Sequence, residues 1–336
     1  MAKRQRQQEP DGPAWSLPAC ATNNGAWNRL GKDTRGLSCW ARRNDVVAVN
    51  AHGALKLYDI ADAAHVLALG EVSLGEQGRG ALSEDWPIHF IDDVTLAAGC
   101  ADGVRIFDLS DAHAPRLHHE HFASPARAPG SFVDDIYFAS GAEVDGVFAQ
   151  RISGADVVML DTARSRYAAP RAFVRVGPLL YVIGHSELQV QPFGVEPWGA
   201  PLKSKSIDCA PDVRVLASPA DPTLLALVTG SSEWGVRMVD VAAPKNPKVS
   251  KRFFHPEPRG VGVVAGTDTL LVLHRPYQEH LALTRIKLAR PLPVASAPVL
   301  LTDDPELACG ALFLEQRGED ILLLATTGRF ALLRHP

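Results

Sequence analysis

Residues 223-TLLALVTGSSEWGVRMVDVAAPKNPKVSKRFF-254 contain the pattern that decides the fold. An apolar run is followed by a short loop, a second run that ends in Asp240, a proline-containing turn and a third run. Runs of this kind, rich in Val, Leu, Ile and aromatic residues and bounded by Gly, Asp and Pro, are typical of β-strands. In tight turns an Asp carboxylate accepts a hydrogen bond from the backbone two residues ahead, and Pro presets φ. The segment therefore predicts three consecutive strands.

The same pattern recurs along the chain. In 46–74 and 94–122 the second run ends in Asp59 and Asp108, respectively. Weaker copies are found at 179–193, 269–288 and 321–335, and 146–162 fits the pattern worst. Most copies are spaced by about 40–50 residues, as the blades of a propeller are. The interval between the copies at 146–162 and 179–193 is shorter, which predicts that blade three or four lacks a strand.

These repeats predict an all-β fold, a single β-propeller of seven blades, with six blades as the alternative. An inner strand ahead of each unit completes a four-stranded meander, and radially stacked meanders cover one another's faces. The last unit ends at Pro336 without an outer strand, and sheets avoid such open edges. We expect 14-AWSLPAC-20 to close the ring by pairing the N- and C-terminal strands. Residues 1–13 are expected to be a disordered tail, and 14–336 the propeller domain.

The repeats resemble the LVIVD-repeat family. Its pattern is an apolar strand, a small turn, Gly-Leu-Arg-Ile-Val-Asp-Val, a short Ser/Asp-x-x-Pro turn and another strand. Segments 235-GVRMVDVAAPKNPKV-249 and 103-GVRIFDLSDAHAPRL-117 match it well, and 54-ALKLYDIADAAHVL-67 matches less closely. The resemblance implies the propeller fold and no activity, because the family is defined by a structural repeat. Many members look extracytoplasmic, and the lack of an apolar leader here departs from that.

Composition is that of a folded protein, with 46% hydrophobic and 21% charged residues and many turn formers. The formal net charge of -4 gives no overall attraction to nucleic acid or to an anionic membrane. The polar, proline-containing start lacks the apolar stretch of a signal peptide, and no window suits a membrane helix. We therefore expect a cytoplasmic protein. Widely spaced thiols suggest buried, unpaired cysteines, namely Cys20, Cys39, Cys100, Cys209 and Cys309.

Four arginines recur at or just before the predicted inner strands, namely Arg35, Arg171, Arg214 and Arg259. In a propeller these strand starts converge on the mouth of the central channel. A guanidinium donates two parallel hydrogen bonds to a carboxylate or phosphate, so the four would form an anion-binding ring. The alternative is that each arginine only forms an ion pair with a nearby acid at the channel mouth, such as Asp212 or Glu257.

Aromatic residues stand in loops that should share the face of the channel mouth. Trp86, Trp234 and Tyr277 lie in 84-EDWPIH-89, 231-SSEWG-235 and 274-HRPYQEH-280, and 255-HPEPR-259 belongs to the same set. Exposed Trp and Tyr anchor protein partners through rigid contact area and a polar group. These three are candidate interface residues, with packing between blades as the equally weighted alternative.

Other groups of chemically active residues favour structural roles. In 118-HHEH-121, strand alternation places His119 and His121 on one face and His118 on the other, which predicts a solvated outer strand rather than a metal site. The acid pairs are typical turn formers, namely Asp92-Asp93, Asp134-Asp135 and Asp303-Asp304. No nucleophile elbow, P-loop, dinucleotide fingerprint or HExxH motif is present. We expect no cofactor and no metal.

Three functions fit these observations. The first is a non-catalytic scaffold that binds a partner protein, with an acidic segment suited to the arginines. The second is a propeller enzyme or small-anion binder at the channel mouth, since such sites draw single residues from different blades and leave no local motif. The third is a structural subunit of a larger assembly. We favour the scaffold.

Overall fold

The computed structural model describes residues 28–29, 37–51, 54–62, 66–73, 87–100, 103–122, 126–141, 147–154, 156–163, 172–184, 187–193, 203–207, 214–229, 235–254, 257–263, 267–277, 280–302, 312–317, 320–325 and 329–334. In these residues the only regular elements are β-strands, and all strand pairs are antiparallel. The all-β prediction is confirmed. The same residues contain no helix able to cross a membrane.

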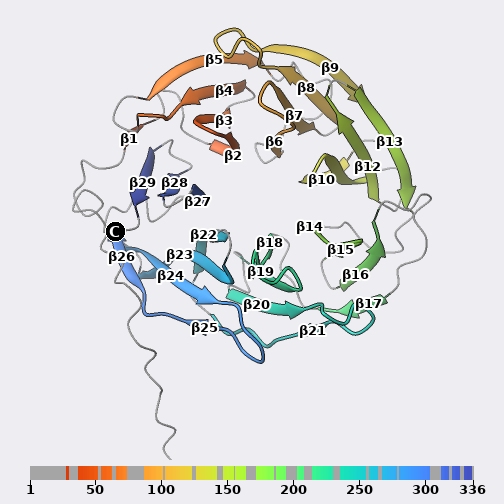
Figure 1. Cartoon of the computed structure of the whole chain (residues 1–336), viewed down its shortest axis with the longest axis vertical. Coiled ribbons are helices and arrows are strands. Elements are labelled where there is room, and N and C mark those ends of the chain that lie inside the picture. Colours follow the sequence, from red (N-terminus) through yellow and green to blue (C-terminus); the bar gives the residue numbers. More distant parts are fainter. Residues whose placement is uncertain are drawn as a thin grey trace, which may run out of the picture.

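The described strands form seven sheets, which are arranged in a ring (Figure 1). Sheet 1 contains β2 (Leu37–Arg43), β3 (Val46–Ala51), β4 (Ala54–Asp59) and β5 (Leu67–Ser73). Sheet 2 contains β6 (Ile88–Phe90), β7 (Thr95–Cys100), β8 (Gly103–Asp108) and β9 (Arg116–Phe122). Sheet 3 contains β10 (Ala126–Val133), β11 (Ile136–Gly141), β12 (Val147–Ser153) and β13 (Asp156–Ala163).

The second half of the chain repeats this order. Sheet 4 contains β14 (Ala172–Val176), β15 (Leu179–Ile183), β16 (Glu187–Pro192) and β17 (Lys203–Ser206). Sheet 5 contains β18 (Arg214–Ala217), β19 (Leu224–Thr229), β20 (Gly235–Asp240) and β21 (Lys248–Val249). Sheet 6 contains β22 (Glu257–Val263), β23 (Thr269–Tyr277), β24 (His280–Lys287) and β25 (Val294–Ala295), and β26 (Val299–Thr302) also pairs with β24.

Sheet 7 joins the two ends of the chain. It contains β27 (Leu312–Arg317), β28 (Asp320–Ala325), β29 (Arg329–Arg334) and, as its fourth strand, β1 (Asn28–Arg29). Asn28 pairs with Phe330 and Arg29 with Arg329. The strand next to β29 is thus Asn28–Arg29, whereas the expected closing segment 14–20 and the tail 1–13 lie outside the described residues.

The short interval between two repeats has a different cause from the one expected. Val147–Ser153 is β12, the third strand of sheet 3, and the preceding strand β11 escaped the pattern. Both sheet 3 and sheet 4 have four strands. The prediction that one of them lacks a strand is wrong, because the copy at 146–162 was assigned to the wrong position within its sheet.

Each hydrophobic cluster lies between two neighbouring sheets. In β19, Leu225 and Leu227 pack with Leu188 of sheet 4, whereas Leu224 and Ala226 on the alternate face pack against sheet 6. Clusters of the same kind join sheets 1 and 2, sheets 2 and 3, and sheets 3 and 4. Strands buried on both faces read as continuous apolar runs, which explains 224-LLALVT-229.

The repeated aspartates make the expected turns. Oδ1 of Asp59 accepts a hydrogen bond from the backbone N of Ala61 at 2.8 Å. Asp108 accepts one from the backbone N of Ser110, also at 2.8 Å. Asp240 accepts one from the backbone N of Ala242 at 3.0 Å. The Asp of the repeat thus ends each third strand by holding the next two residues in a turn.

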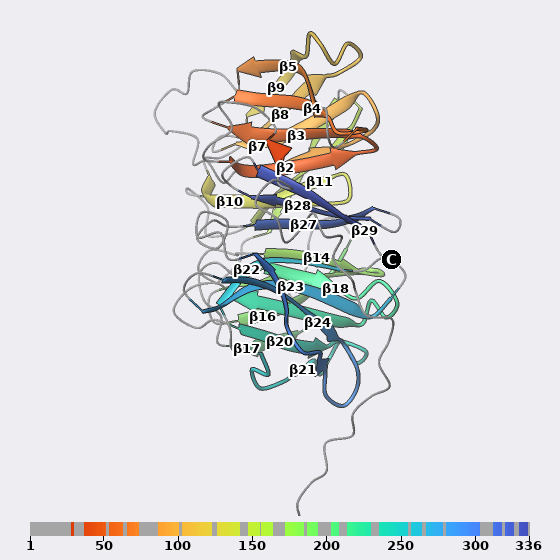
Figure 2. The same cartoon turned by 90° about the vertical axis from the view of Figure 1, so that its left-hand side faces the viewer.

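The strand order gives the ring two different faces, and the strands run from one to the other (Figure 2). The loop face carries the starts of the innermost strands and the connections between second and third strands. The turn face carries the turns between first and second strands, such as 44–45 and 134–135, and the Asp turns. Residues that lie far apart in the sequence therefore meet on each face.

Tight packing between sheets 2 and 3 depends on Gly99 of β7. A Cβ atom at Gly99 would overlap the ring of Tyr137, which is fully buried in β11. We predict that Gly99→Ala lowers the free energy of unfolding by about 1–3 kcal/mol, the usual cost of overpacking a core. Urea denaturation measures this change. In Tyr137→Leu the same Gly99→Ala change should cost less; an equal cost in both backgrounds would contradict the steric explanation.

Candidate functional site

The structure places the backbone of two of the four predicted arginines. Arg214 is the first residue of β18, and Arg259 is the third residue of β22. These are the innermost strands of neighbouring sheets 5 and 6, and both residues stand near their loop-face ends. Arg35 and Arg171 lie outside the described residues, directly before β2 and β14. The anion-binding role of all four stays a prediction.

Arg259 occupies an irregular position in its strand. Pro258 pairs with His274 and Gly260 pairs with Leu273, so Arg259 is an extra residue without a partner in the register. β2 has a comparable shift between Leu37 and Cys39, at the same end of its strand. β-Bulges often redirect side chains next to binding sites. The loop-face ends of the innermost strands therefore include sites where the regular ladder is interrupted.

Of the three predicted aromatic anchors, only the backbone of Tyr277 lies among the described residues. It ends β23 and pairs with His280 across the connection to β24, on the loop face. Trp86 and Trp234 lie outside the described residues, before β6 and immediately before Gly235 of β20. Their role as interface residues also stays a prediction.

A buried histidine near Tyr277 was not singled out from the sequence. The side chain of His274 is 2% exposed, and its Nε2 lies 2.8 Å from Oγ1 of Thr284. Its ring also meets the ring of Phe254 edge-on, at 5.1 Å between centroids. Burial lowers the pKa of His274 to about 4, so the imidazole is neutral at pH 7. His274 thus extends the core between sheets 5 and 6 toward the loop face.

The histidine run on β9 belongs to a solvated outer strand, as expected. Residues 116–120 are exposed. Strict alternation fails here, because Ile106 pairs with His119 while Phe107 pairs with Leu117, which leaves His118 as an extra residue. The rings of His118 and His119 lie 4.7 Å apart, although opposite faces were expected. The part of the chain that the structure describes contains no group of three side chains suited to a metal.

The turn face carries ion pairs between neighbouring sheets. Arg43 of sheet 1 binds Asp93 of sheet 2 at 2.7 Å, and Arg175 of sheet 4 binds Asp134 of sheet 3 at 2.6 Å. The acid pairs 92–93 and 134–135 stand at turns, as predicted, whereas 303–304 lies outside the described residues. Because these pairs are exposed, each stabilises the fold only weakly.

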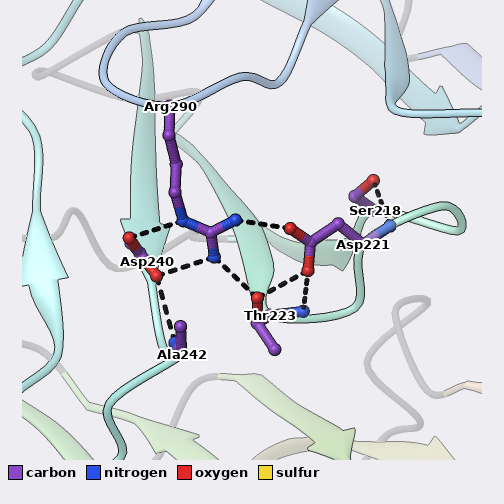
Figure 3. A network of polar contacts seen from close by, with 6 residues as sticks. All are labelled: Ser218, Asp221, Thr223, Asp240, Ala242 and Arg290. Atoms are coloured by element: carbon purple, nitrogen blue, oxygen red, sulfur yellow. Dashed lines mark hydrogen bonds and ion pairs between the residues drawn. The ribbon is translucent and has the colours of Figure 1, made fainter.

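Among the described residues of this face, Arg290 makes the most extensive polar contacts (Figure 3). It follows β24 of sheet 6 and binds both carboxylate oxygens of Asp240 in sheet 5, at 2.8 and 2.9 Å. Its Nη1 donates to Asp221 at 2.5 Å, and its Nη2 donates to Oγ1 of Thr223 at 2.7 Å. The hydroxyl of Thr223 in turn donates to Asp221 at 2.5 Å. A single guanidinium therefore joins two turns of sheet 5 to sheet 6.

These contacts shift the acid–base equilibria of the network. Hydrogen bonding by Arg290 lowers the pKa of Asp240. Hydrogen bonds from Thr223 and then Arg290 lower the pKa of Asp221. The two carboxylates raise the pKa of Arg290 in return. All three groups therefore carry full charge near pH 7, and the network fixes two sheets rather than holding a ligand.

Free thiols occur where the structure describes cysteines. Cys100 is fully buried, as expected, and Cys39 is partly buried, and neither forms a disulfide. Cys20, Cys209 and Cys309 lie outside the described residues.

No known protein-family model matches the sequence, and no curated protein matches it. Solved structures do. A chain of the mitotic checkpoint complex superposes with a TM-score of 0.63 at 15% identity, covering 99% of this chain and 100% of that chain. The WD40 repeats of RRP9 superpose with a TM-score of 0.62 at 11% identity, covering 96% of this chain and 100% of that chain. Chaetomium thermophilum Sqt1, bound to the N-terminus of ribosomal protein L10, superposes with a TM-score of 0.56 at 13% identity. The match covers 89% of this chain and 84% of that chain.

The fold is a β-propeller. Identities this low establish the fold alone, and fold does not fix function. Within this propeller, ion pairs between described residues join neighbouring sheets on the turn face. Of the residues that the sequence nominates for binding, the described backbones of Arg214, Arg259 and Tyr277 stand at strand ends on the loop face.

We predict that Arg290→Ala lowers the free energy of unfolding at pH 7 by about 1–2 kcal/mol, after allowance for solvent screening. The folded pKa values of Asp221 and Asp240 lie below the ordinary value of 3.8. The stabilisation is therefore fully present above that value and is lost as the pH falls through the folded values. Urea denaturation at pH 7 and at about pH 3 measures it. Arg116→Ala, at an exposed arginine of β9, is the matched control. A pH-independent difference would contradict the ionic basis of the network.

Proposed function

We propose that this propeller is a non-catalytic scaffold whose loop face binds a partner protein, with an acidic segment seated over the arginines near the ring axis. The observation that carries the proposal is topological. Arg214 and Arg259 stand at equivalent ends of neighbouring innermost strands, and Tyr277 ends a strand on the same face. Convergent arginines with aromatic residues around them suit a carboxylate-bearing peptide.

The structural neighbours support a protein as the partner. One belongs to the mitotic checkpoint complex, and another is bound to the N-terminus of a ribosomal protein. For this chain we infer the same kind of use, with Arg35, Arg171, Trp86 and Trp234 completing the surface. Reduced thiols at Cys39 and Cys100 suit a cytoplasmic protein, since disulfides are rare there. We also propose that the repeats are of the LVIVD type, because their Asp turns recur at three equivalent positions.

The partner prediction is tested by reversing charge on the loop face. Arg214→Glu with Arg259→Glu should abolish recovery of a stoichiometric partner when the tagged protein is purified from its source cells and quantified by mass spectrometry. The control is Arg116→Glu with Lys287→Glu, which makes the same change in net charge. Arg116 starts β9 and Lys287 ends β24, both on the turn face, so this variant should leave recovery unchanged. Equal recovery with both double variants, or no stoichiometric partner for the wild type, would overturn the scaffold proposal.

We further propose that the seven sheets are the blades of one ring, closed where β1 pairs with β29. Removing β1 would expose the edge of β29, and an unpaired edge destabilises a propeller. Deletion of residues 1–30 should therefore lower the melting temperature by several degrees. Deletion of 1–20 keeps Asn28–Arg29 and should have a smaller effect, and circular dichroism measures both. An unchanged melting temperature after deletion of 1–30 would refute closure by this strand.

A further inference from the structure

A basic edge lies on the outer side of sheets 4 and 5. It consists of Lys205, Lys245, Lys248, Lys251 and Arg252. Residues 243–252 contain four of these cations and no acidic residue, in a chain whose net charge is -4. β17 and β21 are the outermost strands of their sheets, which places the basic edge on the rim of the ring (Figure 1). The charge of this region therefore opposes that of the molecule as a whole.

Three lysines of the basic edge are not held in an ion pair by a described residue. Lys245, Lys248 and Lys251 are exposed, and none forms an ion pair or hydrogen bond with a described residue. In sheets 1 and 2 a cation of the third strand meets an acid of the outer strand: Lys56 lies near Glu71, and Arg105 binds Glu120. Residues 243–252 contain no acid that could take this part in sheet 5.

The Arg290 network occupies the carboxylate that stands nearest to Lys248 in register. Lys248 stands directly opposite Asp240 in the ladder between β21 and β20. Both oxygens of Asp240 already accept hydrogen bonds from Arg290, and one also accepts from the backbone N of Ala242. The carboxylate directly opposite Lys248 is therefore hydrogen-bonded to an arginine of sheet 6. Lys248 acts on Asp240 through its charge but forms no ion pair with it, and its exposed side chain can also meet a ligand.

Sheet 4 adds to the same edge. Nζ of Lys205 in β17 donates a hydrogen bond to the backbone O of Pro247 at 2.5 Å. This contact joins the outer strand of sheet 4 to the turn that carries Lys245 and Lys248. The cations of two sheets consequently form one continuous surface.

The basic edge begins at the turn after Asp240, on the turn face, and continues to the loop face. The segment after β21 continues along β20, since the backbone N of Ser250 donates to Met238 O at 2.8 Å and that of Phe253 donates to Val236 O at 3.1 Å. At its end the side-chain stem of Arg252 lies against Gly235, where an added Cβ would be 2.5 Å from Cδ of the arginine. Gly235 directly follows Trp234, a predicted interface residue. The basic edge therefore ends beside the start of β20.

We propose that the basic edge binds an extended acidic peptide segment of the partner protein. Lysine ammonium groups act as flexible point charges, which suits Glu and Asp side chains spaced along an extended chain. A net negative protein repels a long polyanion such as nucleic acid, whereas a short acidic peptide senses mainly the local charge. This site is separate from the arginines near the ring axis, and it rests on the proposed function in that the ligand is part of a protein.

The test measures binding of a fluorescein-labelled oligoglutamate peptide by fluorescence anisotropy, at about 50 mM and about 300 mM KCl. The wild type should bind at low salt and weaken sharply at high salt. Lys248→Glu with Lys251→Glu should weaken binding by at least about tenfold, and the corresponding Gln variants should weaken it less. Arg116→Glu with Lys287→Glu should bind like the wild type. Circular dichroism confirms that each variant is folded.

Three results would overturn the proposal. They are no binding by the wild type, equal loss in the control double variant, and tighter binding of an oligouridine of matched charge through the same lysines. If Arg214→Glu with Arg259→Glu alone abolishes peptide binding, the basic edge is refuted while the loop-face site stands. If the peptide binds through Lys248 and Lys251 but no partner is recovered from cells, the scaffold function fails and the basic edge remains.

Discussion

Burial of apolar side chains between neighbouring sheets is the interaction on which the whole structure depends. Leu225 and Leu227 face sheet 4, and Leu224 and Ala226 of the same strand face sheet 6. Tyr137 likewise faces sheet 2 while Phe138 faces sheet 4. Exposing either apolar face of a sheet to water is unfavourable in free energy, so each sheet needs a neighbour on both faces. A ring satisfies this need, and its order in space follows the order of the sequence.

The polar contacts between neighbouring sheets lie on the turn face of the ring. On the turn face, Arg43, Arg175 and Arg290 each reach an aspartate of an adjacent sheet. Both oxygens of Asp240 accept hydrogen bonds from Arg290, and Lys248, opposite Asp240 in the ladder, forms no ion pair with it. Contacts that hold sheets together on one side thus leave positive charge exposed on the rim. In this way a stabilising network shapes the surface that we propose for binding.

Much of the fold was predictable because its signals are local. An Asp that ends a strand and accepts from the backbone two residues on involves only neighbouring residues, and Asp59, Asp108 and Asp240 were all recognised. The weak copy at 146–162 was assigned to the wrong strand, because β11 and β12 have similar apolar runs. The bulge at His118 also escaped prediction, since alternation assumes one residue per position.

Contacts across long separations could not be predicted in the same way. Arg290 and Asp240 are 50 residues apart, and nothing near Arg290 signals its partner. The surroundings of Lys248 depend on that contact, so they were also hidden from the sequence. For two of the four arginines the predicted positions near strand starts are described: Arg214 begins β18, and Arg259 is the third residue of β22.

We propose that a partner binds the loop face and the basic edge, whereas the ion-paired turns of the turn face join neighbouring sheets. Hydrogen–deuterium exchange of the purified complex, compared with the free protein, tests it most directly. We predict slower exchange at the start of β18, the start of β22 and residues 248–252 when the partner is bound. Unchanged exchange is predicted for the turns at 134–135, 177–178 and 219–223. Protection confined to those turns would contradict the account.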